Sequence, residues 1–547
     1  MKTMKKFGAL FLAIVMAMAL AVPAMAVENE KTIKVEGLQA GDAVKYVQVI
    51  EWNNTTGWVK TTAFANLSND VFNAVVGSTT TPGKITDASA TAIAAIGADM
   101  TDGGSVATGA TSWTKDNLAP GLYMVQPVAT SADVIYNPVF VAIQADGTGS
   151  VVDVTNLNYD NNGTAKKSDV TVDKKTKSTG DTEWAEATTE DVGDIIDFKV
   201  ETTVPAYLEN YTNPVFTVSD ALTDGLTYAV GDEGAYTTLT VKVGDTELTK
   251  DTDYTITALD ATHWTISFTK DYLQGRTAAT VVTITYQAMI TDAAKNVNPE
   301  SNTVTIDYSR NPSDATDHGT KTDKTTHYTF DIDAKLQGDE NYTTSELIKV
   351  AQDSEGNPIT EEKTYSNTTT HHPLDGAVFT LYKSDGTTPY TNSEYPNGVT
   401  VTSANGGLLE IKGLDEGTYV LKETTPASGY MLMTDYLEFT ITATYKTVEA
   451  TDTCNAYQEL DTYSVAVTHV AANGDRTAGA TSTYTLDNGT ITKTGGVAGD
   501  ASNEIVNVKG QSLPSTGGIG TKIFYTMGAV LVVGAGVVLV SRKRAGE

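Results

Sequence analysis

Cysteine, basic residues and long hydrophobic runs are all scarce in this sequence of 547 residues. The single cysteine, Cys454, excludes a disulfide within the chain. Lysine and arginine total 37 against 68 acidic residues, and the net charge is −31. This balance argues against a nucleic-acid partner, because phosphate binding needs clustered basic residues. The HExxH, GxSxG and P-loop motifs are missing, so we expect neither an enzyme nor a cofactor.

The long apolar runs occur near the two ends of the chain. The first run, residues 7–22, follows three lysines and precedes the small-x-small motif Ala24-Met25-Ala26. This pattern predicts a secretory signal peptide over residues 1–26. The second run, residues 523–540, has 18 uncharged residues and is followed by the basic residues 542–544. It predicts a membrane-spanning helix whose basic end stays in the cytoplasm.

Between these runs the composition favours β-structure. The chain has 26 Tyr against 12 Phe, and Thr and Val are frequent over long stretches, which is typical of strands. Helical periodicity is weak and limited to residues 87–96. Polar connectors at 154–170 and 313–325 divide the region, so we expect domains at 27–165, 170–312 and 326–510. The predicted fold class is all-β.

A short motif stands just before the second apolar run, and it consists of Leu513, Pro514, Ser515, Thr516 and Gly517. With the apolar run and the basic tail, residues 513–547 resemble the sorting signal of Gram-positive surface proteins. The resemblance implies that a sortase cuts between Thr516 and Gly517 and transfers the Thr516 acyl group to an amine. An ordinary single-pass anchor with a chance LPSTG is the alternative.

Sequence inside the domains extends the resemblance to the backbone subunits of sortase-assembled pili. Residues 121–125 (GLYMV) and 137–143 (NPVFVAI) resemble segments of the N-terminal pilin domain. Residues 374–382 (LDGAVFTLY) resemble a strand of Cna-B domains, and residues 417–430 (GTYVLKETTPASGY) resemble the pilin E-box. The resemblance implies immunoglobulin-like and Cna-B-like β-sandwich domains in an elongated tandem array.

The same resemblance implies two covalent cross-links. In this family a lysine of the opening strand is joined to an asparagine of the closing strand, with an acidic residue nearby. The two matching sets here are Lys174, Asp220 and Asn302 in the middle domain and Lys349, Glu423 and Asn507 in the last domain.

Strand alternation places the two lysines on buried faces. Lys174 shares a strand face with Val172, and Lys349 shares one with Leu347. Lys335 lies on the opposite face from the apolar residues of its own strand, so it remains the second choice in the last domain.

Burial gives each set its chemistry. Burying an amine beside a carboxylic acid lowers the pKa of the amine and raises that of the acid. The neutral amine is then a nucleophile, and the protonated acid can polarise the asparagine carbonyl. Attack expels ammonia and leaves an amide, in a single self-modification with Asp220 and Glu423 as the catalytic residues. The bond restricts the unfolded chain as a disulfide does, but it cannot be reduced.

The polymerising lysine departs from the family pattern. Backbone pilins usually carry a YPKN motif between the first two domains, whose lysine attacks the acyl-sortase of the next subunit. The corresponding residues 159–162 read YDNN here. The nearest amines are Lys166 and Lys167, and an exposed polar connector suits a nucleophile for an external enzyme. The displaced motif also fits a subunit that has lost polymerisation.

The sequence therefore predicts the major subunit of a covalently polymerised pilus, anchored to peptidoglycan and serving adhesion. Its precursor would pass through the membrane, and its partners would be sortases, peptidoglycan, copies of itself and accessory pilins. A host surface or glycan ligand stays open. The alternatives are a non-polymerising anchored adhesin or accessory pilin and a wall-anchored enzyme with its site in the first domain. No metal is expected, because the His371–His372 pair lacks further spaced ligands.

Overall fold

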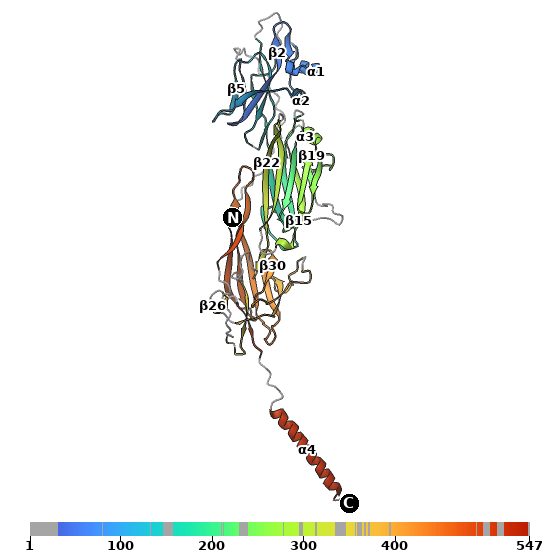
Figure 1. Ribbon diagram of the computed structural model, residues 1–547, viewed down its shortest axis with the longest axis vertical. Coiled ribbons are helices and arrows are strands. Elements are labelled where there is room, and N and C mark those ends of the chain that lie inside the picture. Colours follow the sequence, from blue (N-terminus) through green and yellow to red (C-terminus); the bar gives the residue numbers. More distant parts are fainter. Residues whose placement is uncertain are drawn as a thin grey trace.

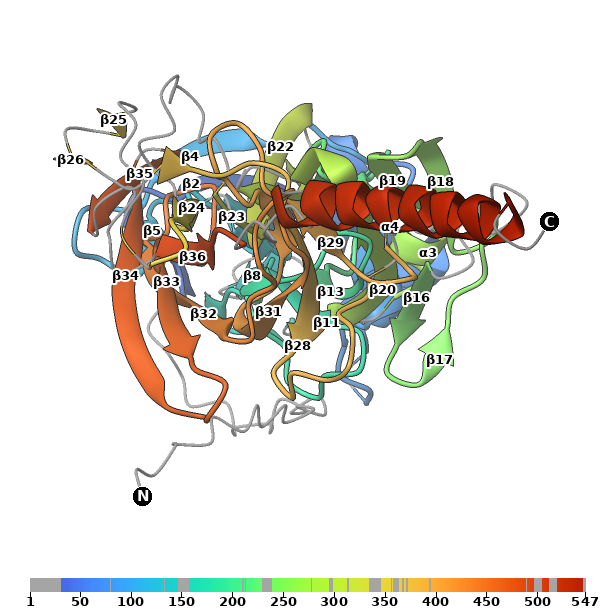
Figure 2. The ribbon, with the colours of Figure 1, turned by 90° about the horizontal axis from the view of Figure 1, so that it is seen from below.

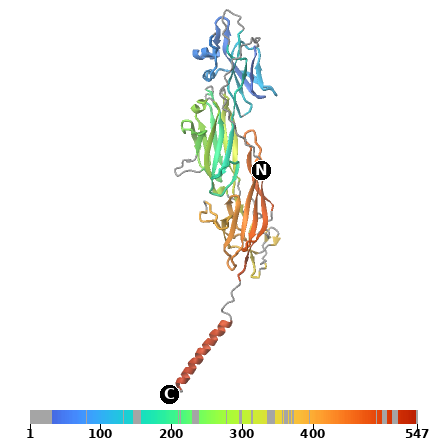
Figure 3. The same cartoon turned by 180° about the vertical axis from the view of Figure 1, so that it is seen from behind.

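The chain forms three β-rich bodies in a row, followed by a long helix (Figure 1; Figure 3 from behind). The computed structural model describes residues 31–544 except 79, 132, 146–156, 209–210, 212, 229–238, 277, 295–298, 312–313, 334–345, 356, 358–363, 366–367, 370–371, 393–394, 488, 496–503 and 511–518. The predicted signal peptide, the LPSTG motif, Lys335 and His371 lie outside the described residues.

The N-terminal region, residues 31–169, is built around β2, which pairs with β3, β4 and β6, while β6 also pairs with β8. The burial of nearly every residue of β6 explains why its GLYMV segment is apolar throughout. The strands are β1 (Ile33–Glu36), β2 (Ala43–Asn53), β3 (Gly57–Lys60), β4 (Thr101–Ser105), β5 (Ser112–Lys115), β6 (Gly121–Val128), β7 (Val134–Tyr136), β8 (Val139–Ile143), β9 (Asn162–Thr164) and β10 (Lys167–Asp169).

Two α-helices cover part of this region. The helix α2 (Asp87–Ala94) lies where the sequence shows its weak helical period, and Thr86 and Ser89 form a capping box at its start. The helix α1 (Asn69–Val76) was not predicted. It spans only two turns, and Val75 is its one fully buried residue. A helix this short does not show a recognisable periodic pattern of apolar residues in the sequence.

The middle region, residues 170–328, is a sandwich of two six-stranded sheets. One has the order β11-β13-β20-β16-β17 with β15 beside β20, and the other has the order β12-β22-β21-β14-β19-β18. A short helix, α3 (Lys270–Gln274), follows β19. The strands are β11 (Val172–Ser178), β12 (Ala187–Thr189), β13 (Ile195–Val204), β14 (Phe216–Leu222), β15 (Leu226–Tyr228), β16 (Thr240–Val243), β17 (Thr246–Glu247), β18 (Tyr254–Leu259), β19 (His263–Phe268), β20 (Thr280–Ile290), β21 (Glu300–Asn311) and β22 (Asp314–Tyr328).

The C-terminal region, residues 329–510, carries a seven-stranded sheet of order β29-β28-β31-β32-β33-β34-β35 and a smaller sheet of order β27-β24-β36. Figure 2 shows β33 and β34 curving along one side of it. The strands are β23 (Phe330–Ile332), β24 (Ile348–Gln352), β25 (Thr364–Tyr365), β26 (Thr368–Thr369), β27 (His372–Pro373), β28 (Val378–Lys383), β29 (Thr400–Thr402), β30 (Ile411–Leu414), β31 (Gly417–Thr425), β32 (Tyr436–Val448), β33 (Tyr457–Val470), β34 (Arg476–Asp487), β35 (Thr490–Gly495) and β36 (Glu504–Val508).

Both expected connectors contain strands. Residues 313–325 were predicted to be a linker, but most of them belong to β22, which pairs with β21 along its length. Within the first connector, β9 runs parallel to β1 and β10 pairs with β7. The polar composition of these segments led to the wrong expectation, because their backbones are paired while most of their side chains are polar.

A long hairpin joins the middle and C-terminal regions. The strands β32 and β33 reach up beside the middle region (Figure 1), and the tip of the hairpin bonds to β22. The Thr322 amide donates to the Thr453 carbonyl at 2.7 Å, and the Asn455 amide donates to the Thr322 carbonyl at 3.0 Å. This hairpin contact adds to the backbone connection between the two regions.

The chain ends in α4 (Ile519–Arg544). Residues Ile523–Arg542 of this helix are long and apolar enough to cross a membrane, and their side chains pack on no other part of the described chain. The position agrees with the predicted span at 523–540.

Candidate functional site

Two lysines are buried among the residues that the structure describes, and they are Lys174 and Lys349, both 0% exposed. A buried ammonium is unfavourable unless a partner compensates its charge. Both lysines were singled out by strand alternation, and each has a carboxylate beside it. We describe the two surroundings in turn as the middle set and the C-terminal set.

In the middle set, the three predicted residues come from both sheets of the sandwich. Lys174 lies on β11 between the buried Val172 and Thr176, while Asp220 lies on β14 and Asn302 on β21 of the opposite sheet. The strands β14 and β21 pair directly with Leu222 opposite Asn302. Lys174 therefore reaches across the core toward the acid and the amide.

The contacts in the middle set bring all three residues together through one hydroxyl. Lys174 Nζ lies 2.6 Å from Asp220 Oδ2 and also donates to Tyr286 Oη. Tyr286 donates to Asp220 Oδ2 at 2.7 Å, and Asn302 Nδ2 donates to Tyr286 Oη at 3.0 Å. Tyr228 donates to Asp220 Oδ1 at 2.8 Å. Among the described residues, nothing donates a hydrogen bond to Asn302 Oδ1.

Burial dominates the electrostatics of the middle set. It lowers the pKa of Lys174, and the charge of Asp220 opposes this shift. It also raises the pKa of Tyr286 well above the usual value for tyrosine. The Lys174 ammonium lies 5.2 Å from the ring centre of Phe198, so its surroundings away from Asp220 are largely aromatic. Such a site favours the neutral amine that a nucleophile requires.

Sequence reasoning missed the two tyrosines. Tyr286 ends the predicted strand at 281–286, and alternation with Val282 and Ile284 places it on the buried face. The sequence therefore did contain a signal for a polar group near Tyr286, because a buried tyrosine hydroxyl needs a hydrogen-bond partner. Nothing in the sequence indicated that Tyr228 and Tyr286 share the same carboxylate.

The middle set also differs from the expected strand order. Asn302 was expected on the closing strand, but β21 is followed by β22, which carries Asp323. Asp323 accepts the backbone N–H of Lys174 at 2.7 Å. The additional strand thus holds the backbone of the lysine in place.

In the C-terminal set, lysine and asparagine lie on neighbouring parallel strands. The strands β24 and β36 pair with Lys349 opposite Ile505 and Ala351 opposite Asn507. Lys349 and Asn507 are therefore two positions apart in register, which puts their side chains on one face. Glu423 lies on β31, and its side chain is buried.

Glu423 lies between the lysine and the asparagine of this set. Lys349 Nζ is 3.5 Å from Glu423 Oε1, and Asn507 Nδ2 donates to Glu423 Oε2 at 2.9 Å and to the Met431 carbonyl at 2.9 Å. The Met433 amide donates to Glu423 Oε2 at 2.7 Å. Burial lowers the pKa of Lys349 to about 8, and Glu423 opposes the shift. About a tenth of the amine is then neutral at pH 7, far more than for an ordinary lysine.

The predicted polymerising lysines both lie on the surface. Lys166 and Lys167 are exposed, and Lys167 belongs to β10 and forms an exposed ion pair with Asp169 at 3.0 Å. The Lys166 carbonyl accepts the Asn137 amide, so the backbone beneath the two lysines is fixed. Both amines are accessible, and these facts do not distinguish between them.

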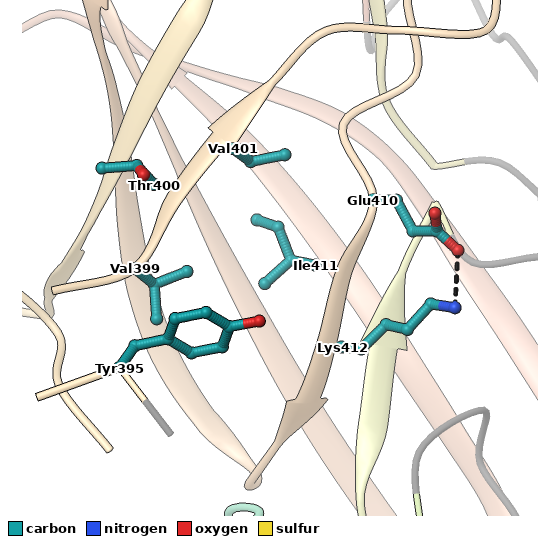
Figure 4. A pocket seen from close by; sticks show the side chains of 7 residues that line it. All are labelled: Tyr395, Val399, Thr400, Val401, Glu410, Ile411 and Lys412. Atoms are coloured by element: carbon teal, nitrogen blue, oxygen red, sulfur yellow. Dashed lines mark ion pairs between the residues drawn. The ribbon is translucent and has the colours of Figure 1, made fainter. Parts of the chain in front are cut away.

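A surface pocket of about 160 Å³ lies in the C-terminal region, beside β29 and β30 (Figure 4). Its charged residues, Glu410 and Lys412, pair with each other at 2.8 Å. The pocket is smaller than most small-molecule sites, and neither buried lysine lines it. It is lined by Tyr395, Val399, Thr400, Val401, Glu410, Ile411 and Lys412.

Comparison with protein families matches three parts of the chain. A Gram-positive pilin backbone subunit 2, Cna-B-like domain, matches residues 192–312. A prealbumin-like fold domain matches residues 358–454, and an LPXTG cell wall anchor motif matches residues 505–545. The first match contains Asp220 and Asn302, and the last contains Asn507.

Two relatives are similar over most of the chain. The trypsin-resistant surface T6 protein of Streptococcus pyogenes serotype M6 is 27% identical over 447 residues, which is 75% of this chain and 76% of that protein. The solved structure of the T6 backbone pilin of serotype M6 Streptococcus pyogenes, a modular three-domain protein, has a TM-score of 0.52 at 17% identity. That match covers 89% of this chain and 100% of the T6 chain. This likeness, with the sheets described above, confirms the predicted all-β fold of tandem domains.

Proposed function

We propose, from the premise that the chain is a Gram-positive backbone pilin with an LPXTG cell-wall anchor, that its copies are joined end to end into the shaft of a pilus. The matched family models and the similarity to the T6 protein confirm the predicted family. The chain is a structural subunit rather than an enzyme, and it is held in the cell wall after a transient stage in the membrane. The steps of assembly and stabilisation that follow are proposals.

A sortase is the proposed assembly partner. It would cut between Thr516 and Gly517 and pass the Thr516 acyl group to a lysine of the next copy, or to peptidoglycan at the base of the shaft. Lys166 and Lys167 are the proposed acceptors, because both are exposed and stand on paired backbone close to the middle region. Accessory pilins and a host surface or glycan ligand are further proposed partners, serving adhesion.

Two internal amide cross-links would make each subunit resistant to unfolding. The observation that supports them is the burial of Lys174 and Lys349, each in contact with a carboxylate at 2.6 Å and 3.5 Å. In each set the asparagine amide lies one hydrogen bond away from a group that contacts the lysine. Such a grouping of amine, acid and amide in an apolar core is the arrangement that amide formation requires.

Intact-mass analysis tests the cross-links directly. The soluble fragment 27–510 should lack the mass of two ammonia molecules, and peptide mapping should find Lys174 joined to Asn302 and Lys349 joined to Asn507. A fragment with the mass of its unmodified sequence would refute both cross-links. The loss of a single ammonia would retain the cross-link that the mapping identifies and refute the other.

An immunoblot of cell-wall extract separates a shaft subunit from an accessory subunit. A shaft subunit gives ladders of high mass on a denaturing gel. Changing both Lys166 and Lys167 to Ala should abolish the ladders and leave monomer in the wall, whereas Lys250→Ala, at another exposed lysine, should leave them unchanged. Ladders that persist in the double variant would exclude these two lysines, and a wild type without ladders would favour the accessory subunit.

A further inference from the structure

One hydroxyl group contacts every member of the middle set. Tyr286 Oη accepts hydrogen bonds from Lys174 Nζ and from Asn302 Nδ2, the latter at 3.0 Å, and it donates to Asp220 Oδ2 at 2.7 Å. The described side-chain hydrogen bonds of Asp220 go to Lys174, Tyr228 and Tyr286, and none joins it to Asn302. Tyr286 therefore bridges the lysine and the amide nitrogen.

The C-terminal set has a different arrangement. There Glu423 itself contacts both reacting groups, since Asn507 Nδ2 donates to its Oε2 at 2.9 Å and Lys349 Nζ lies 3.5 Å from its Oε1. A single carboxylate can thus serve both the lysine and the asparagine. In the middle set the acid contacts the lysine but does not hydrogen-bond the asparagine, so a second group is needed between them.

We infer that Tyr286 is a catalytic residue. Its hydroxyl takes a proton from Lys174 and gives its own proton to the departing amide nitrogen of Asn302. This inference rests on the proposed cross-link between these two residues. It assigns to Asp220 the separate task of taking the proton that makes the lysine ammonium neutral, across its 2.6 Å contact.

The atoms of this reaction balance as follows. Lys174 gives one of its three ammonium protons to Asp220, and the neutral amine attacks Cγ of Asn302. The Nζ–Cγ bond forms, and Nζ passes a second proton to Tyr286 Oη. The original hydroxyl proton of Tyr286 moves to Nδ2, the Cγ–Nδ2 bond breaks, and ammonia leaves. Nζ keeps its third proton as the amide N–H, and Tyr286 ends as the neutral hydroxyl with which it began.

Packing holds the Tyr286 ring in one position. The ring stacks on Phe198 with centroids 5.2 Å apart and meets the edge of Trp264 at 5.2 Å. The residue lies on the central strand β20, opposite Phe198 of β13 in register. The packed ring keeps Oη beside the reacting atoms, so the relay needs only a turn of the O–H bond from Asp220 toward Nδ2 of Asn302. Its neutral form is also kept by burial, which raises the pKa of the phenol.

The variant Tyr286→Phe tests the relay, because it removes the hydroxyl and keeps the stacked ring. Fragment 27–510 would be made by cell-free synthesis and sampled over time from the end of synthesis by intact mass and peptide mapping, because an amide that has already formed survives denaturant. We expect the Lys174–Asn302 bond to form at least about 100-fold more slowly in the variant. The Lys349–Asn507 bond should form at the wild-type rate and so serve as a control within each molecule.

Two further variants separate chemistry from folding. Tyr254→Phe makes the same change in the same core, next to Phe268 and away from the middle set, and it should cross-link at the wild-type rate. Asn302→Ala gives the reference for a folded but unlinked middle region. We expect Tyr286→Phe to match its far-ultraviolet circular dichroism and unfolding temperature before any bond forms.

The outcomes distinguish the relay from the cross-link itself. A wild-type fragment in which Lys174 and Asn302 are never joined would refute the proposed cross-link. A wild type that cross-links beside a Tyr286→Phe variant that does so at the same rate would overturn the relay alone. A variant that fails to match the folded reference would likewise overturn it, because its defect would then be one of packing.

Discussion

Replacing Asn302 by alanine should destabilise the middle region by about 5 kcal/mol through the unfolded chain alone. The proposed bond between Lys174 and Asn302 closes a loop of roughly 130 residues, and the entropy of closing such a loop corresponds to about 5 kcal/mol at 25 °C. The hydrogen bond from Asn302 Nδ2 to Tyr286 does not enter this difference, because Nδ2 leaves as ammonia when the bond forms. For a region of this size we expect its unfolding temperature to fall by roughly 15 °C.

Scanning calorimetry of fragment 27–510 measures this shift. Lys174→Ala removes the same cross-link but changes different local contacts. The decrease in unfolding temperature that both variants share therefore measures the effect of the cross-link. Asn507→Ala is the matched control, because it should lower a separate transition of the C-terminal region and leave the middle transition in place. If Asn302→Ala shifted the middle transition by only a few degrees, the loop-closure argument would be refuted.

Three further predictions concern the C-terminal set, the anchor and the junction between regions. Glu423→Ala should abolish one ammonia loss and keep the other, and two losses in its intact mass would contradict the role of Glu423. Wall-extracted protein should end at Thr516 and lack residues 517–547, so mass analysis that found the apolar run would exclude sorting. Burial raises the pKa of Glu190 to about 8 and that of Asp415 to about 7, so both carboxyls hold protons in the folded chain that they release on unfolding at neutral pH. The unfolding free energy should therefore fall as the pH rises from about 5 to 8, and Glu190→Gln should flatten the slope in denaturant titrations, whereas a stability that rises over this range would contradict the argument.

Strand alternation was sufficient to find the two buried lysines. Apolar residues precede both lysines on the same strand faces, Val172 before Lys174 and Leu347 before Lys349, and such a pattern predicts a buried face. The acids and asparagines could be placed only through the resemblance to a known family. Alternation says that a residue points inward, but it cannot say which inward residues from distant strands will meet.

The strand β22 shows why the rest was not predictable. Its inward residues include Asp323, Thr325 and His327, all buried, and none of them gives an apolar alternation. They are tolerated inside because Asp323 accepts the amide of Lys174 and Thr325 shares a hydrogen bond with His327. The sequence of such a strand resembles that of a linker, because the partners that stabilise its polar side chains are far away in the sequence and cannot be identified from it.

The positions of the proposed bonds define how a pulling force would pass through a subunit in the shaft. The force would enter near Lys166 or Lys167, just before β11, and leave near Thr516, shortly after β36. The cross-links from Lys174 to Asn302 and from Lys349 to Asn507 would then bypass residues 175–301 and 350–506, which would carry no tension along their backbones.

The tension between the two cross-links would fall on residues 302–349, which include β22. That strand is held on one side by β21, and its Thr322 is bonded on the other to the tip of the β32–β33 hairpin through Thr453 and Asn455. The hairpin thus fastens the part of the chain that the cross-links leave loaded. This role follows from where the two proposed bonds would end, because a segment already bypassed by a bond would gain nothing from such a contact.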